Sequence, residues 1–410
     1  MMVVPLPEGV TLPRRALAAV VLLGFALSGC MATGFSDMTA SVASTATGLV
    51  TSKPEGEPIP VQLFIASTRR DDRSVGEAVA DGGVHHSLVQ VTLPARHATG
   101  QIETPSFGKA DPSKHFILSG ARRLTPERFN LELANHISGR VGADRDVLLY
   151  VHGFNNSLEE VRFRMAQIVA DARFGGVAVL FTWPSQTSLL SYVSDKERAT
   201  ASRDALEALM RDLASVSGVG RVHILAHSMG AWLAMEGLRE NAIAGRPDLN
   251  GKLGEVMLAA PDIDLSVFRQ QMARLEGRAR VSVLVSRSDR ALNLSSRLAG
   301  DRPRLGALDP TKPAEEAELK KLGVKVYDIS SFSGGFIGHA VYANAPEVIR
   351  NIGARLSTAR KGEAAGMAEI DATGEASAPV ASAPVASAAP EADTLAPREP
   401  IVATPLAPAQ

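Results

Sequence analysis

The chain has 410 residues, of which 45% are hydrophobic, a composition typical of a globular protein rather than a disordered one. With 43 basic and 44 acidic residues the formal net charge is −1, so the balance lacks the basic excess of a nucleic-acid-binding domain. The single cysteine excludes a disulfide within the chain.

The first thirty residues have the pattern of a secretory signal. Arg14 and Arg15 precede an apolar run over residues 16–26, which is well short of the roughly 20 residues that a membrane-spanning helix needs. The next four residues, LSGC, end at Cys30 and resemble the lipobox of bacterial lipoproteins. That resemblance implies removal of residues 1–29 and lipidation of Cys30. The alternative is a plain cleaved signal or an uncleaved anchor, with the cysteine incidental.

Lipidation would attach the protein to a membrane, because each buried methylene of an acyl chain contributes about 0.8 kcal/mol. We therefore expect a lipid-anchored protein of the bacterial cell envelope that faces the periplasm. The resemblance to lipoproteins implies the outer membrane rather than the inner one, because Met31 follows the cysteine where an inner-membrane retention signal has aspartate. Residues 30–58 are small, polar and unpatterned, and we expect a flexible tether there. Residues 359–410 contain the repeat ASAPVASAPVASAAP, which has little to bury and predicts a disordered tail. The predicted folded domain spans residues 59–358.

Within this domain, predicted strands alternate with predicted helices. Two early segments have the composition of strands, and six later ones are near-continuous apolar runs, as expected of strands that are buried on both faces of a parallel sheet. In chain order, these strands are predicted over 61–67, 87–94, 146–151, 177–183, 221–227, 255–260, 280–286 and 325–329.

The segments between the strands have helical spacing. The apolar residues of 158–168 and those of 206–213 each fall on one helical face. Ser157 and Glu160 predict a capping box at the first of these helices, and Pro346 suits the first turn of a last helix. The alternation predicts an α/β fold with a mostly parallel, doubly wound sheet and helices on both faces. In such sheets ligands bind beyond the carboxyl ends of the strands.

One strand end carries a serine in the segment HILAHSMGAWLA, residues 223–234. Ser228 is either a helix cap or a nucleophile on the sharp strand-to-helix turn of α/β-hydrolases. That turn needs small residues two positions before and after the serine, and Ala226 and Gly230 meet this demand, although the usual esterase pattern has glycine first. A nucleophilic serine also needs a base, a group that orients the base, and donors for the oxyanion.

His339 is the predicted base. Of the nine histidines, eight precede Ser228 and only His339 follows it. The order along the chain in α/β-hydrolases is serine, acid, histidine, which leaves His339 without a competitor. The alternative is an ordinary surface histidine in a glycine-rich loop.

The acid has two candidates, each after an apolar run. We favour Asp289 over Asp262 because it follows the strand where the fold usually has its acid. The alternative for Asp262 is an Asx turn or helix cap. The alternative for Asp289 is a turn aspartate paired with Arg287 or Arg290.

The oxyanion site is predicted from backbone N–H groups. One belongs to Met229, the residue after the serine, and the other to the segment HGFNN, where Phe154 is favoured. His152 is expected to shape this loop rather than to titrate. Trp183 and Tyr192 either line an acyl pocket or serve as packing.

From about residue 60 to 356, the chain resembles a bacterial α/β-hydrolase domain family of unassigned function. The matching segments are VTLPARHATGQIETP, YVHGFNNS, FTWPSQ, AHSMGAWL, LAAPDIDLSVF, SRSDRALNLS and GHAVY. The resemblance implies the hydrolase fold and a serine-hydrolase mechanism, with Ser228 as nucleophile and His339 as base. It supplies no substrate, and it leaves the acid open because PDID and SRSD both match.

The sequence thus predicts an enzyme, a serine hydrolase that cleaves a carboxylic ester through an acyl-enzyme. Its expected partners are a small-molecule or lipid ester and, through Cys30, the membrane, but not nucleic acid. No cofactor is expected, and no metal, since neither H-E-x-x-H nor a Cys/His cluster occurs. His85 and His86 are expected in a solvated loop. Two alternatives stay open, a non-catalytic envelope binding or scaffold lipoprotein that retains the fold, and an acyltransferase that uses the same triad.

Overall fold

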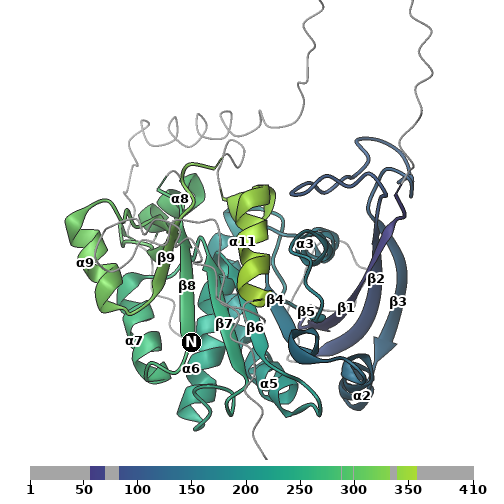
Figure 1. Ribbon diagram of the computed structural model, residues 1–410. Helices are drawn as coiled ribbons and strands as arrows, with labels where there is room; N and C mark the ends of the chain where they lie inside the picture. The colour runs from purple at the N-terminus through teal and green to yellow at the C-terminus, as the bar shows by residue number, and fades with distance from the viewer. Residues whose placement is uncertain (1–55, 70–82, 288, 299, 333–338, 358–410) are drawn as a thin grey trace, which may run out of the picture. The chain divides into compact units, whose positions relative to one another are not determined.

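Figure 1 shows the computed structural model of the protein. The structure describes residues 56–69, 83–287, 289–298, 300–332 and 339–357. The chain divides into two units, Met1–Pro54 and Glu55–Gln410, and all the described residues lie in the second. The predicted signal, lipidation site and tail lie outside the described residues, as does nearly all of the predicted tether.

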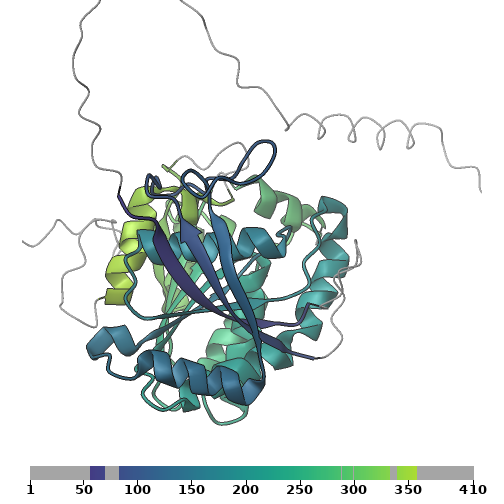
Figure 2. The same ribbon diagram turned by 90° about the vertical axis from the view of Figure 1, so that its right-hand side faces the viewer.

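A nine-stranded sheet forms the centre of the second unit, with the strand order β3-β2-β1-β5-β4-β6-β7-β8-β9. Strand β2 is antiparallel to its neighbours β1 and β3, and all other adjacent pairs are parallel. The strands are β1 Ile59–Ser67, β2 His85–Leu93, β3 Ile117–Leu124, β4 Val147–Val151, β5 Val177–Thr182, β6 Val222–His227, β7 Leu253–Ala259, β8 Arg280–Val285 and β9 Lys325–Asp328. Strands β1 to β3 face the viewer in Figure 2.

Helices cover both faces of the sheet. One face packs against α2, α4, α5, α6, α7 and α9, and the other against α3, α10 and α11 (Figure 1). The helices are α2 Pro126–Ile137, α3 Leu158–Asp171, α4 Tyr192–Ala201, α5 Arg203–Ser215, α6 Met229–Ile243, α7 Leu265–Leu275, α8 Arg290–Leu298, α9 Pro313–Lys321, α10 Val341–Asn344 and α11 Pro346–Ser357. This architecture confirms the predicted fold class. None of the helices in the described parts of the chain is long and apolar enough to cross a membrane.

The two cores explain the unbroken apolar runs. In β4, Val147, Leu149 and Val151 join the core on one face, while Leu148 and Tyr150 join the core on the other. Because successive side chains of a strand point to opposite faces, a strand covered on both sides has mostly apolar positions. The eight predicted strands are all present, with ends within two residues of those predicted.

Strand β3 was not predicted from the sequence. Its segment ILSGARRL lies at the edge of the sheet, and six of its eight residues are exposed, so no apolar run marks it. The expectation of a solvated loop at His85 and His86 is wrong, because these residues begin β2. The ring of His86 packs against Phe129 with centroids 4.7 Å apart.

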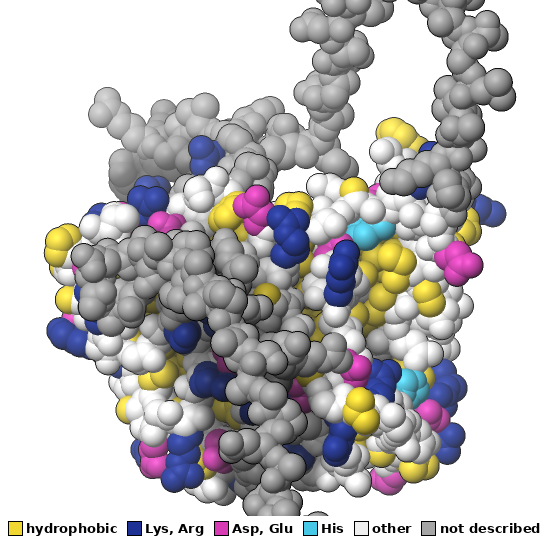
Figure 3. All heavy atoms as spheres, in the orientation of Figure 1, with side chains coloured by type: hydrophobic (Ala, Val, Ile, Leu, Met, Phe, Trp, Pro, Cys, Tyr) yellow, Lys and Arg dark blue, Asp and Glu magenta, His cyan; other side chains and the backbone are white. Residues whose placement is uncertain are grey.

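The predicted helix starts are confirmed. The backbone N–H of Glu160 donates to the Ser157 hydroxyl at 3.2 Å, and the Ser157 N–H donates to the Glu160 carboxylate at 2.7 Å. Pro346 occupies the first turn of α11. This capping box fixes α3 directly after the carboxyl end of β4, where the candidate oxyanion loop lies. On the face drawn in Figure 3, basic and acidic side chains of the described residues are interspersed rather than gathered by sign.

Candidate active site

Ser228 forms the whole connection between β6 and α6. Its backbone has φ 55° and ψ −123°, a conformation that costs a residue with a side chain on the order of 1–3 kcal/mol. Hydrogen bonds hold it there. The Ser228 N–H donates to the Ala259 carbonyl at 3.0 Å, and the Ser228 carbonyl accepts from the Asp262 N–H at 3.1 Å. The sharp strand-to-helix turn expected around the serine is therefore present.

The side chain of Ser228 makes no capping hydrogen bond with α6. Ser228 thus stands at the N-cap position of α6, but its side chain does not cap the helix. The residue is only 4% exposed, which withdraws it from bulk water. The same turn leaves the N–H of Met229, the first residue of α6, among the amides that have no partner within the helix.

Two glycines allow the loop after β4 to approach Ser228 closely. A Cβ atom on Gly230 would lie 2.1 Å from the carbonyl oxygen of His152. A Cβ atom on Gly153 would lie 2.7 Å from Nδ1 of His227 and 2.9 Å from Cβ of Ser228. Any side chain at either position would force the two segments apart. The backbone of HGFNN thus reaches the serine turn only because these residues are glycines.

Asp289 and His339 form a hydrogen-bonded pair. The His339 Nδ1 atom lies 2.6 Å from Oδ2 of Asp289, and the aspartate side chain is fully buried. The other oxygen, Oδ1, accepts the N–H groups of Ala291 and Leu292 at 2.9 and 3.0 Å at the start of α8. Both carboxylate oxygens are engaged, so the orientation of Asp289 toward the imidazole is fixed. Pairing of Asp289 with Arg287 is not observed, because that arginine lies nearest to Asp328 and Asp309.

Asp262 points elsewhere. Its carboxylate accepts the hydroxyl groups of Ser295 at 2.5 Å and Tyr192 at 2.7 Å, and it lies 3.3 Å from Nε of Arg304. Arg304 is itself only 8% exposed. This aspartate therefore neutralises a buried guanidinium and ties α8 to α4, while only its backbone N–H contacts Ser228. Asp264, two residues later, caps α7 and pairs with Arg302.

His227 connects the serine turn to His339. Its Nε2 atom lies 2.9 Å from the backbone carbonyl of His339, and the two rings lie 4.6 Å apart. Its ring also stacks on Tyr342 at 4.5 Å. Burial, together with the nearby His339, holds the pKa of His227 well below 6.5, so the ring is neutral and Nε2–H is the donor. The sequence reasoning assigned no role to His227.

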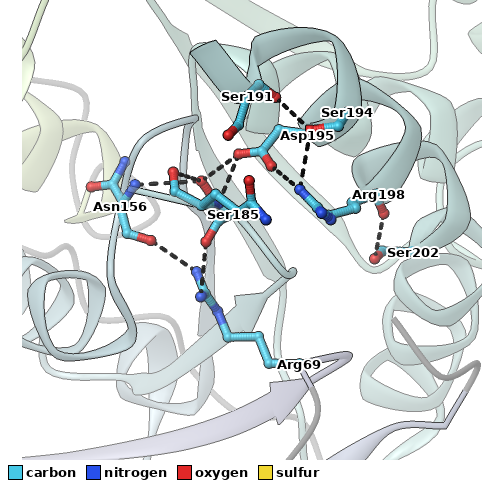
Figure 4. Close-up of polar contacts among 9 residues, drawn as sticks. Arg69, Asn156, Ser185, Ser191, Ser194, Asp195, Arg198 and Ser202 are labelled. Atoms are coloured by element: carbon cyan, nitrogen blue, oxygen red, sulfur yellow. Dashed lines mark hydrogen bonds and ion pairs between the residues drawn. The ribbon is translucent and has the colours of Figure 1, made fainter. Parts of the chain in front are cut away.

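The candidate oxyanion loop is held by its own asparagine and by a buried arginine. The Asn156 amide donates to the carbonyls of Gly153 and Phe154 at 3.2 and 2.7 Å. Arg69 donates to the Asn156 carbonyl at 3.0 Å, to the Ser185 carbonyl at 3.1 Å and to the Thr182 hydroxyl at 2.9 Å. Figure 4 shows the guanidinium between the loops that follow β4 and β5.

The second of these loops is fixed from the other side by α4. The Asp195 carboxylate accepts the Ser185 hydroxyl at 3.1 Å and the Gln186 N–H at 2.8 Å, and it pairs with Arg198 at 2.8 Å (Figure 4). Sequence reasoning missed this network. Its only sequence signal is that Arg69 directly follows the carboxyl end of a predicted strand.

The aromatic residues at this edge have different surroundings. Trp183 is fully buried, stacks on His152 at 5.1 Å and donates to the His152 carbonyl at 2.9 Å, so it is packing and not a pocket wall. Tyr192 meets the ring of Phe154 edge-on at 5.6 Å. Burial, with the positive charge of Arg69, lowers the pKa of His152 to about 3. His152 therefore stays neutral and shapes the loop, as expected.

Alongside Tyr192, Lys196 extends from α4 over α6. Its ammonium lies 3.5 Å from the ring centroid of Trp232, and burial lowers the pKa of Lys196 to about 7. No group of three or more His, Cys, Asp and Glu side chains in the described ranges could hold a metal ion. The glycines expected around His339, at 334, 335 and 338, lie outside the described residues.

Two solved structures and one family model show similarity to this chain. An esterase of Pyrobaculum calidifontis is 12% identical, with a TM-score of 0.34, and the match covers 72% of this chain and 84% of that chain. Brefeldin A esterase, described as a bacterial homologue of human hormone sensitive lipase, is 12% identical, with a TM-score of 0.35 and coverage of 77% and 80%. Among curated proteins, no relative matches this sequence. The family model of an alpha/beta hydrolase of unknown function (DUF900) matches residues 127–360, more than half of the chain. The chain belongs to this family of alpha/beta hydrolases.

Proposed function

We propose that this protein is a serine hydrolase that cleaves carboxylic esters through an acyl-enzyme on Ser228. The observation that carries the proposal is the hydrogen bond between His339 and the buried Asp289. His227 links His339 to the adjoining Ser228, whose backbone is held at φ 55°. A strained serine with an oriented imidazole in its neighbourhood has the groups that nucleophilic catalysis requires.

In the proposed reaction, the Ser228 oxygen bonds to the ester carbonyl carbon while its proton passes to Nε2 of His339. The N–H groups of Met229 and Phe154 stabilise the resulting oxyanion. His339 then returns the proton to the leaving alkoxide as the ester C–O bond breaks. Water attacks the acyl-enzyme in the same way, its proton passing through His339 to the Ser228 oxygen. Asp289 holds the imidazole in the tautomer that leaves Nε2 free to accept a proton.

We propose further that Cys30 carries lipid and anchors this domain to the bacterial envelope, facing the periplasm. The motif LSGC after a short apolar run supports this part of the proposal. It is tested separately, by growing cells with a palmitate analogue and comparing the wild type with Cys30→Ser. Incorporation into both proteins, or into neither, would contradict lipidation at Cys30.

Labelling with a fluorophosphonate probe tests the nucleophile. Intact protein should be labelled, Ser228→Ala should not, and His339→Ala should be labelled far more slowly. Ser215→Ala is the matched control, because Ser215 is exposed at the end of α5 and its hydroxyl bonds only to Arg211 within the same helix. Equal labelling of Ser228→Ala and Ser215→Ala would refute the assignment.

Hydrolysis of short p-nitrophenyl esters tests the reaction class. Wild-type turnover that His339→Ala abolishes supports an acyl-enzyme. Analysis of the products with and without glycan or lipid acceptors then separates hydrolysis from acyl transfer. Labelling without turnover of any ester would favour the binding or scaffold alternative.

A further inference from the structure

A cavity of about 350 Å³ lies between the strands β1 to β3 and the first half of α3. Its lining includes neither Ser228 nor His339 nor Phe154. Among the described residues, its lining consists of basic, apolar and serine side chains, without aspartate or glutamate. The basic side chains are Arg69, Arg122, Arg123, Arg162, His85 and His86.

Carboxylates of the described residues interact with three of these arginines. Arg122 pairs with Glu132 at 3.2 Å. Arg162 has an attractive charge interaction with Glu159, but no ion pair joins Arg162 to a carboxylate among the described residues. The charges of Asp195 and Glu160 raise the pKa of Arg69, while the three hydrogen bonds from its guanidinium to described residues go to neutral oxygens.

Two buried donor or acceptor atoms at the cavity lack partners. Nε of Arg162 and Nδ1 of His86 are both buried, and neither has a hydrogen-bond partner in the parts of the chain that the structure describes. Burial lowers the pKa of Arg69 to about 10 and also lowers that of Arg162, yet both guanidinium groups stay charged at neutral pH. A buried charge with unsatisfied donors is costly unless a ligand completes it.

We propose that this cavity binds a small oxyanion, a phosphate or carboxylate group, with the guanidinium of Arg162 as its main contact. Guanidinium groups match the oxygens of phosphate and carboxylate through paired N–H donors. The described lining residues are basic, apolar or uncharged, which favours a ligand of negative charge. Arg69 lies in its wall and also holds the Asn156 carbonyl, so the anion site and the candidate oxyanion loop share one residue.

Isothermal titration of the full chain with pyrophosphate, inorganic phosphate and citrate tests the proposal. Sodium chloride at equal ionic strength is the control ligand. We expect saturable binding of at least one of the three oxyanions, weakened as salt is added because the contact is electrostatic. Pyrophosphate and citrate distinguish the phosphate class from the carboxylate class.

Arg162→Met should weaken this binding by about tenfold or more, since charge-assisted hydrogen bonds are lost. Arg162→Lys keeps the charge but not the paired donors, so its affinity for the oxyanion should lie between those of the wild type and Arg162→Met. Arg274→Met is the matched control, because Arg274 is exposed in the last turn of α7 and does not line the cavity. Thermal unfolding without ligand shows whether each variant folds, and Arg162→Lys carries the test if the methionine variant does not.

Binding of none of the three oxyanions overturns the proposal. So does binding that Arg162→Lys and Arg274→Met retain equally. The measurement needs no turnover, so it stands or falls independently of the proposed ester hydrolysis.

Discussion

The Nδ1 atom of His339 lies 2.6 Å from the Oδ2 atom of Asp289, although fifty residues separate them in the chain. The carboxylate is fully buried, and its other oxygen accepts two backbone N–H groups of α8. Asp289 therefore cannot turn away from the imidazole. A carboxylate fixed in this way selects the tautomer of His339 in which Nδ1 carries the proton and Nε2 is basic.

Asp289→Asn should abolish most of the activity and leave the fold intact. Asparagine caps helices about as well as aspartate, so the bonds to Ala291 and Leu292 persist. Its amide would donate to Nδ1 of His339 and force the wrong tautomer, which should lower kcat by about 10³- to 10⁴-fold. Ester hydrolysis and thermal unfolding measure the two effects. A larger loss of kcat in folded Asp262→Asn than in Asp289→Asn would make Asp262 the acid.

Asp262→Asn should act on stability instead. The substitution leaves the buried guanidinium of Arg304 without its counter-charge, and removing one member of a buried ion pair costs about 3–5 kcal/mol. Urea unfolding measures this loss. Asp212→Asn is a suitable control, since that aspartate is exposed on α5 and its loss should change the free energy of unfolding by less than about 0.5 kcal/mol. Equal stability of the two variants would contradict the role of Asp262.

His227→Phe should slow fluorophosphonate labelling by about tenfold, because the His339 carbonyl loses its donor at a cost of about 1 kcal/mol or more. Phenylalanine keeps the stacking on Tyr342, so the variant tests the loss of the hydrogen-bond donor without the loss of ring packing. His227→Gln supplies an N–H and should recover part of the rate. Because His227 is already neutral, its replacement should leave the pH profile of labelling unchanged in shape. A shifted acid limb would instead make His227 a titrating base.

Gly153→Ala should reduce activity at least tenfold and destabilise the protein by about 1–3 kcal/mol, the usual cost of overpacking. The new methyl group would press on the imidazole of His227 and the Cβ atom of Ser228. Gly120→Ala is the matched control, since its methyl group would meet only Gln90 at an ordinary 3.9 Å. Comparison of kcat/KM and of the free energy of unfolding checks both effects. Wild-type activity in Gly153→Ala would show that the loop does not approach the serine as closely as described.

His97 should make stability depend on pH. Its ring nitrogens lie 2.9 Å from Glu103 and 3.1 Å from Asp171. Burial alone would lower the pKa of His97, but the hydrogen bonds with Asp171 and Glu103 outweigh it and raise the pKa above 6.5. Its contribution is therefore fully present below pH 6.5 and is lost as the pH rises through the raised value.

The contribution of Asp171 to stability changes with pH in the opposite direction. Burial would raise its pKa, but hydrogen bonds from His97, Gln167 and Gly100 lower it below 3.8. Its contribution is present above pH 3.8 and is lost as the pH falls. The interactions of His97 with Glu103 and Asp171 should thus stabilise the fold most between pH 3.8 and 6.5. His97→Gln should remove the decline in the free energy of unfolding above pH 6.5. Urea unfolding at several pH values measures this. An unchanged slope in the variant would exclude His97 as its source.

Strands with both faces covered could be predicted from the sequence, because burial on two sides leaves a near-continuous apolar run as in β4, β5 and β6. Strand β3 could not, since an exposed edge imposes no such pattern. The order of chemical groups along the chain was also sufficient to single out Ser228 and His339. The apolar runs and the order of these residues can both be recognised along the chain, without knowing which segments pack together.

The choice between Asp262 and Asp289 could not be made from the order of residues along the chain. Both aspartates follow apolar runs, and only the packing of α8 and α4 turns Asp262 toward Arg304 and Tyr192. Arg69 was missed for a related reason. It reaches Thr182 and Asn156 because β1 pairs with β5 in the sheet, a pairing between segments more than a hundred residues apart.

The sequence by itself determined the layered α/β fold, the serine turn and the single downstream histidine, because periodicity, small residues and chain order are properties of the chain. The tertiary structure alone decided which carboxylate faces His339 and which cations surround the cavity beside β1 to β3. Those contacts depend on the order of the strands in the sheet and on which buried charges lie close together. Both join residues that are far apart in the sequence, so no local pattern predicts them.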